Sequence, residues 1–76
     1  MAWTGCPLVV SRAAYLSGTP ALRDDPRVPA DAVVESMDLG ESAEDVVENY
    51  GLRTTVKDVL QIYEYAKRQR ALHPAR

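Results

Sequence analysis

The chain has 76 residues, of which 46% are hydrophobic and 26% are charged, so we expect it to fold as a single domain over residues 1–76. It has no long apolar run and only one cysteine, Cys6, which excludes a membrane-spanning helix and an internal disulfide bond. Because the N-terminus lacks the features of a signal peptide, we expect a cytoplasmic protein. Residues 24–48 carry nine acids against one arginine, a net charge of −8, whereas residues 49–76 carry six basic residues against two acids, a net charge of +4.

The first third of the chain predicts a small β-element over residues 8–28. Short strands are expected at residues 8–10, 21–23 and 27–28. The sequence Ser-Gly-Thr-Pro at residues 17–20 is typical of a turn. Pro26 and Pro29 lack a backbone N–H, so the strand that contains them must lie at an edge of the sheet.

Two amphipathic helices are expected to follow the β-element. The first begins at or just after Pro29 and ends at Gly40, a residue type that favours the position after a helix. Ser42 is a good N-cap for the second helix, and Asp45 stands at the position of the capping-box acid. Gly51 ends this helix. Its predicted buried face consists of Ala43, Val46, Val47 and Tyr50.

A third helix is predicted from about Val56 to about Leu72, with Thr54 or Thr55 as its cap. Two of its faces are apolar. The face expected to pack in the core contains Val56, Val59, Leu60, Tyr63 and Ala66. The opposite face contains Ile62, Tyr65, Gln69 and Leu72. We predict that this second face is a dimer or partner interface, and the alternative is that it packs on the N-terminal strands.

Two helices, a short turn and a threonine-capped third helix are typical of a helix-turn-helix. The predicted fold class is therefore mainly α, with a three-helix bundle over residues 29–72. In such a bundle the start of the third helix faces the major groove, and the candidate DNA-binding residues are Arg53, Thr54, Thr55, Lys57 and Gln61. The alternative is a helix cap followed by a solvated helix face. Glu44 and Glu48, on the preceding helix, would oppose DNA.

Three stretches, "YLSGTPAL", "PRVPADAVVESMDLGESAEDVVENYGL" and "TTVKDVLQIYEYA", resemble the bacterial family called domain of unknown function 433. The resemblance covers about residues 8–66. The motif positions are Gly18-Thr19-Pro20, Pro26-Arg27-Val28-Pro29-Ala30, Ser42-Ala43-Glu44-Asp45 and Tyr65-Ala66. Pro26 stands where the family usually has a threonine, so any role of that hydroxyl is absent here.

The resemblance implies a homeodomain-like three-helix domain with a short N-terminal β-element. It also implies an antitoxin-like role, in which a dimer binds a PIN-like nuclease toxin and, in many cases, its own operator DNA. On this reading, the basic end of the chain is a toxin-docking tail that includes residues 73–76. Its candidate residues are Lys67, Arg68, Arg70 and Arg76. The alternative is that these cations complement the C-terminal end of the helix dipole.

Other charged or reactive residues suggest no catalytic site. His73 is the only histidine and lies far along the chain from Cys6, so we expect no enzyme, no metal and no cofactor. Arg27 is expected to form an ion pair with Asp31 or Glu35. The acids expected to be solvated are Asp24, Asp25, Asp38 and Glu41.

The sequence thus predicts a non-enzymatic, antitoxin-like protein that forms a homodimer, binds a toxin and in addition operator DNA, with no contact to a membrane. Two alternatives stay open. One is a dimeric protein-interaction module without DNA binding, which the acidic middle of the chain favours. The other is a stand-alone transcriptional regulator.

Overall fold

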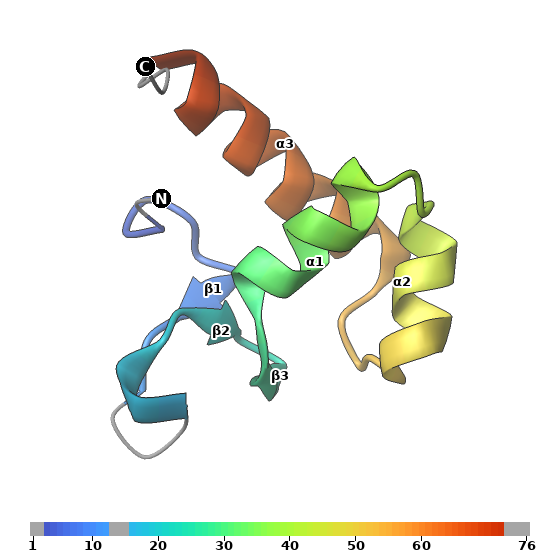
Figure 1. Cartoon of the computed structure of the whole chain (residues 1–76). Coiled ribbons are helices and arrows are strands. Elements are labelled where there is room, and N and C mark those ends of the chain that lie inside the picture. The colour runs from blue at the N-terminus through green and yellow to red at the C-terminus, as the bar shows by residue number, and fades with distance from the viewer. Residues whose placement is uncertain (1–2, 13–15, 73–76) are drawn as a thin grey trace.

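Within residues 3–12 and 16–72, which the computed structural model describes, the chain forms three α-helices and a small antiparallel sheet of three strands (Figure 1). The strands are β1 (Val9–Val10), β2 (Ala21–Leu22) and β3 (Asp25–Pro29). The helices are α1 (Ala30–Asp38), α2 (Ala43–Tyr50) and α3 (Val56–Leu72). A 3-10 turn at Leu16–Gly18 overlaps the predicted turn at residues 17–20. The predicted mainly helical class and the order of elements are confirmed.

The sheet has the order β1-β2-β3, and both pairs of neighbours are antiparallel. The strand with the two prolines, β3, lies at an edge, as their missing N–H groups predict. It is longer than expected because it begins at Asp25. Directly after it, the N–H of Ala30 donates to the carbonyl of Pro20, so the start of α1 is tied to the sheet.

The ends of α2 are set by its sequence. Ser42 Oγ accepts a hydrogen bond from the N–H of Asp45, and the Asp45 carboxylate accepts one from the N–H of Ser42, which completes the predicted capping box. Gly51 has a φ of 61°, in the left-handed region that favours glycine, and it ends the helix. For α3 the predicted choice of cap is resolved in favour of Thr55, whose Oγ1 accepts from the N–H of Asp58.

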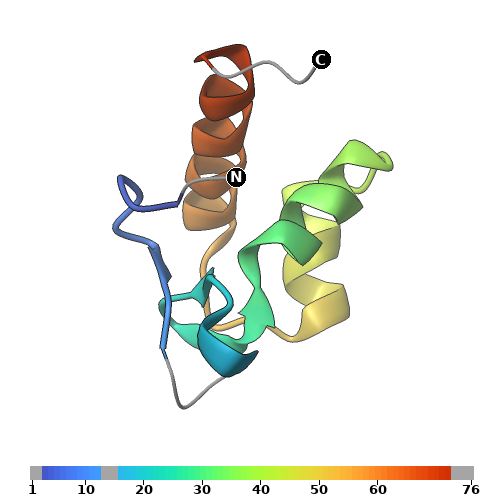
Figure 2. The same ribbon diagram turned by 60° about the vertical axis from the view of Figure 1, so that its left-hand side comes forward.

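The core lies where α1, α2, the sheet and the N-terminal segment meet around α3. Figure 2 shows α1 and α2 on one side of α3 and the N-terminal segment on the other. The α3 side chains in the core are Val59, Ile62 and Ala66, all fully buried. The largest buried side chains from other elements are Leu22, Val33 and Val46. As a result, α3 is covered from two directions.

The N-terminal strap, which we define as residues 3–8, covers the second apolar face of α3. The ring of Trp3 stacks on the ring of Tyr65 with 5.6 Å between the centroids, and Trp3 Nε1 donates to Asp31 Oδ1 at 3.1 Å. The N–H of Gly5 donates to the Tyr65 hydroxyl at 3.1 Å. A Cβ at Gly5 would lie 2.9 Å from that hydroxyl, so the strap approaches α3 as closely as only glycine allows.

The predicted interface face of α3 is therefore wrong in its central residues. Ile62 is fully buried, and Tyr65 is half-buried beneath the strap. The alternative was packing on the N-terminal strands, but the segment that covers Tyr65 is the strap that precedes β1. Gln69 is half-buried, and Leu72 is 69% exposed. Leu60, predicted to lie in the core, is 46% exposed, because α1 and α2 pack against the side of α3 that carries Val59 and Ala66.

Tyr50 was also expected in the core and is 41% exposed. Its hydroxyl shares a 3.0 Å hydrogen bond with Ser36 Oγ and so links the end of α2 to α1. A phenol ring can cover apolar neighbours while its hydroxyl stays at the surface, which explains why an apolar periodicity alone misplaces it.

Replacing Trp3 with alanine is expected to lower the free energy of unfolding by about 3 kcal/mol, because a buried indole that stacks and donates a hydrogen bond is lost. Urea denaturation followed by circular dichroism measures this change. Thr4→Ala is the control, because Thr4 is exposed, and its effect should stay within about 0.5 kcal/mol. If the two substitutions lower the free energy of unfolding equally, the contacts of Trp3 do not stabilise the fold.

Candidate interaction surface

The turn before α3 is held by a carboxylate from the proline-rich strand. Asp25 Oδ1 accepts from the N–H of Arg53 at 2.8 Å, and Oδ2 accepts from the N–H of Thr54 at 2.9 Å. Thr54 Oγ1 donates a third hydrogen bond to Oδ2. Two successive N–H groups that converge on one anion form a nest of the kind that binds carboxylates and phosphates. The expectation that Asp25 is solvated is therefore wrong.

These contacts also set the charge of Asp25. Partial burial raises its pKa, but the hydrogen bonds from the Arg53 N–H, the Thr54 hydroxyl and the Thr54 N–H together lower it by more. The pKa of Asp25 is therefore below its ordinary value, and the group is ionised at neutral pH. Because the carboxylate is ionised, both of its oxygens can accept hydrogen bonds from the turn before α3.

The same contacts divide the five predicted DNA-binding residues. Thr54 is only 3% exposed and its hydroxyl is used by Asp25, so its assignment to a DNA surface is wrong. Thr55 uses its Oγ1 to cap α3. Arg53, Lys57 and Gln61 are exposed and lie on or just before the first two turns of α3. These three side chains remain available to a ligand, and exposed Thr55 can still donate through its hydroxyl.

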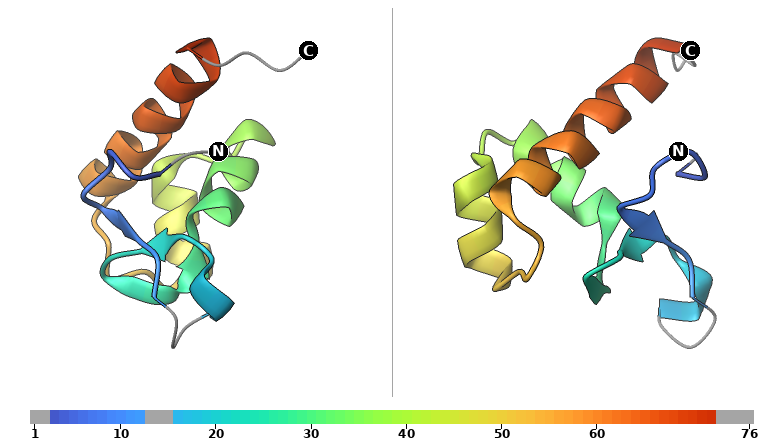
Figure 3. Two further views of the ribbon diagram at one scale, coloured as in Figure 1. Left: turned by 90° about the vertical axis from the view of Figure 1, so that its left-hand side faces the viewer. Right: turned by 180° about the vertical axis from the view of Figure 1, so that it is seen from behind.

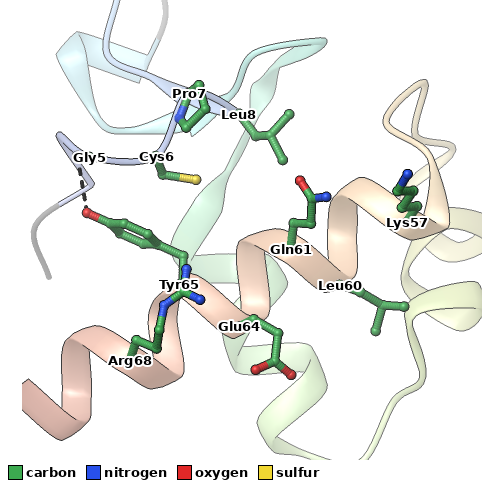
Figure 4. Close-up of a pocket in the computed structure, with 10 residues that line it drawn as sticks. All are labelled: Gly5, Cys6, Pro7, Leu8, Lys57, Leu60, Gln61, Glu64, Tyr65 and Arg68. Carbon is green, nitrogen blue, oxygen red and sulfur yellow. Dashed lines mark hydrogen bonds between the residues drawn. The ribbon is translucent and has the colours of Figure 1, made fainter.

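Exposed side chains form a continuous stripe along α3, which we call the outer face. Its members are Lys57, Leu60, Gln61, Glu64 and Arg68. Between the outer face and the strap lies a groove of about 550 Å³ (Figure 4). Its strap side is formed by Gly5, Cys6, Pro7 and Leu8. Figure 4 shows Gln61 pointing toward Leu8, whereas Leu60 and Glu64 point away from the strap.

The predicted docking cations do not form one patch. Arg70 pairs with Asp38 at 3.2 Å, and Tyr63 donates to the same carboxylate at 2.8 Å. Asp38 is exposed, as expected, but its carboxylate also joins the end of α1 to α3. The hydrogen bond from Tyr63, followed by the contact with Arg70, holds the pKa of Asp38 below its ordinary value. Lys67 pairs with Glu64 at 3.0 Å and lies 5.3 Å from the centre of the Tyr63 ring.

Arg68 is the exposed cation at one end of the groove, while Arg76 and the rest of the predicted tail lie outside the described residues. The C-terminal half of α3 extends beyond α1 and the sheet in both views of Figure 3. Near its end, Leu72 is 69% exposed. Exposed Leu72 thus lies near the end of the projecting half of α3, one turn after Arg68 at the end of the groove.

A second hollow, of about 330 Å³, lies at the β3 edge. It is lined by Asp24, Asp25, Pro26, Arg27, Val28 and Arg53. Arg27 is exposed here. Asp31, one of its two predicted ion-pair partners, accepts a hydrogen bond from Trp3. Asp24 pairs with Arg23 at 3.1 Å on the surface, as its expected solvation allows.

Comparison with known proteins gives no relative: no family model, no curated protein and no solved structure matches the chain. Over residues 3–12 and 16–72, no group of three or more His, Cys, Asp or Glu side chains is placed to hold a metal ion. In the same part of the chain, no helix has both the length and the apolar character to span a membrane.

Replacing Asp25 with asparagine is expected to lower the free energy of unfolding at pH 7 by about 1–2 kcal/mol, since hydrogen bonds to a charged acceptor are lost at a partly buried site. Denaturant titration of both proteins measures it. Asp24→Asn is the neighbouring control, and its effect should be close to zero, because Asp24 contacts only an exposed arginine.

The pH dependence gives the same substitution a second readout. Because the pKa of Asp25 is lower in the folded protein, its stabilisation is complete above the unfolded value of about 3.9 and is lost as the pH falls through the folded value. The difference between the wild type and Asp25→Asn should therefore shrink in acid. A difference that stays constant down to the lowest pH at which the protein is folded would exclude the charged contact.

Proposed function

We propose that this chain is a non-enzymatic, antitoxin-like protein that binds a PIN-like nuclease toxin. The observation that carries the proposal is the projecting end of α3, where exposed Leu72 follows exposed Arg68 by one turn. An apolar side chain beside an arginine is typical of the residues that dominate protein interfaces. The resemblance to domain of unknown function 433 supplies the class of partner.

Chemistry supports this choice of partner. A nuclease active site that binds divalent cations is rich in carboxylates, and an arginine placed among them neutralises their charge and displaces the metal ions. Arg68 is exposed on a helix and lines the end of the groove, so the backbone that carries it is held in place. We also propose that the three helices have a homeodomain-like arrangement and that the protein is cytoplasmic.

Co-expression with the product of the adjacent gene tests the proposal. The two proteins should purify together through a tag on the partner, and Leu72→Glu or Arg68→Glu should abolish copurification because each places a negative charge at the interface. Leu16→Glu is the matched control: Leu16 is 39% exposed in the 3-10 turn, at the opposite end of the molecule from the end of α3 (Figure 1), and this variant should still copurify. Absence of copurification with the wild type would refute the toxin partner.

Binding of operator DNA is the second candidate function, and exposed Arg53, Lys57 and Gln61 at the start of α3 favour it. Lysine and glutamine can read base edges, and arginine can hold phosphate. Three such side chains neutralise few phosphates, so binding must be weak and sensitive to salt unless two subunits act together.

A gel-shift titration with the DNA upstream of the gene should show a complex at about 50 mM salt that is lost as the salt concentration rises. Lys57→Ala should weaken it, whereas Thr54→Ser should not, because Thr54 is buried and keeps its hydroxyl for Asp25. If no complex forms at low salt, DNA binding is excluded and the interaction module without DNA binding is the function that remains.

A further inference from the structure

The outer face of α3 carries opposite charges at positions that a two-fold rotation exchanges. Lys57 and Glu64 are both exposed and lie seven residues apart, which is close to two helical turns and about 10 Å along the axis. They therefore occupy nearly the same angle around the helix. Leu60 and Gln61 lie midway between them and are exposed as well.

We propose that the chain forms a symmetric dimer in which the outer faces of two α3 helices pack antiparallel, with the two-fold axis between Leu60 and Gln61. In this register Lys57 of each copy meets Glu64 of the other, so the interface contains the same ion pair twice, as two-fold symmetry requires. Moving the axis one turn toward the C-terminus would place the two Glu64 side chains against each other. The charges thus favour the proposed register over the one a turn away.

The two Leu60 side chains give this dimer an apolar centre. On the outer face, Leu60 points away from the strap, whereas Gln61 points toward Leu8 at the edge of the groove (Figure 4). A two-fold axis keeps each side chain on its own side of the interface, so Leu60 meets Leu60 of the other copy at the axis spacing of about 8–10 Å that packed α-helices have. Burying Leu60, now 46% exposed, removes one of the large apolar side chains at the surface.

The existing contact of Glu64 does not compete with this arrangement. Its bond to Lys67 joins two side chains that are about half exposed, and such pairs contribute little to stability. A carboxylate also has two oxygens and can accept from both lysines. The expected interface is small, so association should depend on protein concentration.

This dimer does not depend on the proposed toxin, because Leu72 and the projecting end of α3 lie outside it, one at each end of the assembly. The dimer does exclude DNA binding by the outer face, because Lys57 and Gln61 would be covered and could not contact DNA at the same time. The dimer therefore agrees with an interaction module and competes with direct readout by α3.

The test is light scattering of the isolated chain at low salt over a range of concentrations up to millimolar. The wild type should approach twice the mass of one chain. Lys57→Glu and Glu64→Lys should each weaken dimerisation by about tenfold or more, because each creates two like-charged contacts. The double variant, with both substitutions, should dimerise again. An equimolar mixture of the two single variants should form a heterodimer.

Leu60→Glu should give a monomer, and Leu39→Glu, on a different surface, should remain a dimer. Circular dichroism melting establishes that every variant is folded. A wild type that stays monomeric at the highest concentration overturns the proposal. So does a double variant that fails to dimerise although it folds, or a Lys57→Glu variant that dimerises as the wild type does.

Discussion

The position of α3 depends on one carboxylate. Asp25 extends from the edge strand β3 and takes up both N–H groups of the turn at Arg53 and Thr54, together with the hydroxyl of Thr54. Those N–H groups would otherwise need water or another partner at a place where Thr54 is almost fully buried. The contact closes a loop of 28 residues between the sheet and the start of the helix that α1 and α2 pack against.

A second consequence concerns how so small a chain obtains a core. With α1 and α2 on one side of α3 and the strap on the other, both apolar faces of the helix are used within the chain. Trp3 closes this arrangement because it contacts both Tyr65 on α3 and Asp31 on α1. What remains exposed on α3 is a narrow stripe centred on Leu60, and this is why the proposed contacts with other molecules concentrate there or at the projecting end.

Local signals in the sequence predicted local structure well. The capping box at Ser42, the helix end at Gly51 and the edge position of the proline strand all follow from the conformations open to individual residues. Long-range contacts could not be predicted in this way. Asp25 stands among other acids and prolines, and nothing near it in the sequence indicates that its donors lie 28 positions away.

The misplaced face of α3 has a related cause. Periodicity shows that a helix has two apolar faces, but it does not say which of them another segment will cover. Leu60 and Ile62 differ little in hydrophobicity, yet Ile62 is fully buried and Leu60 is half exposed. Ile62 lies within about 60° of Val59 and Ala66 around the helix, on the side that packs in the core, whereas Leu60 lies about 100° from Val59. For the candidate site, the sequence predicted that Lys57 and Gln61 are exposed, but it placed Leu60, which lies between them, in the core.

The strap has a consequence for the order in which the protein assembles. The strap closes a longer loop than Asp25 does: Gly5 and Tyr65 are 60 residues apart, whereas Asp25 and Arg53 are 28 apart. During synthesis the strap leaves the ribosome well before the residue that it binds. Its buried side chains, the thiol of Cys6 among them, therefore stay in water until α3 has emerged, and whenever the strap detaches that thiol is open to thiol reagents.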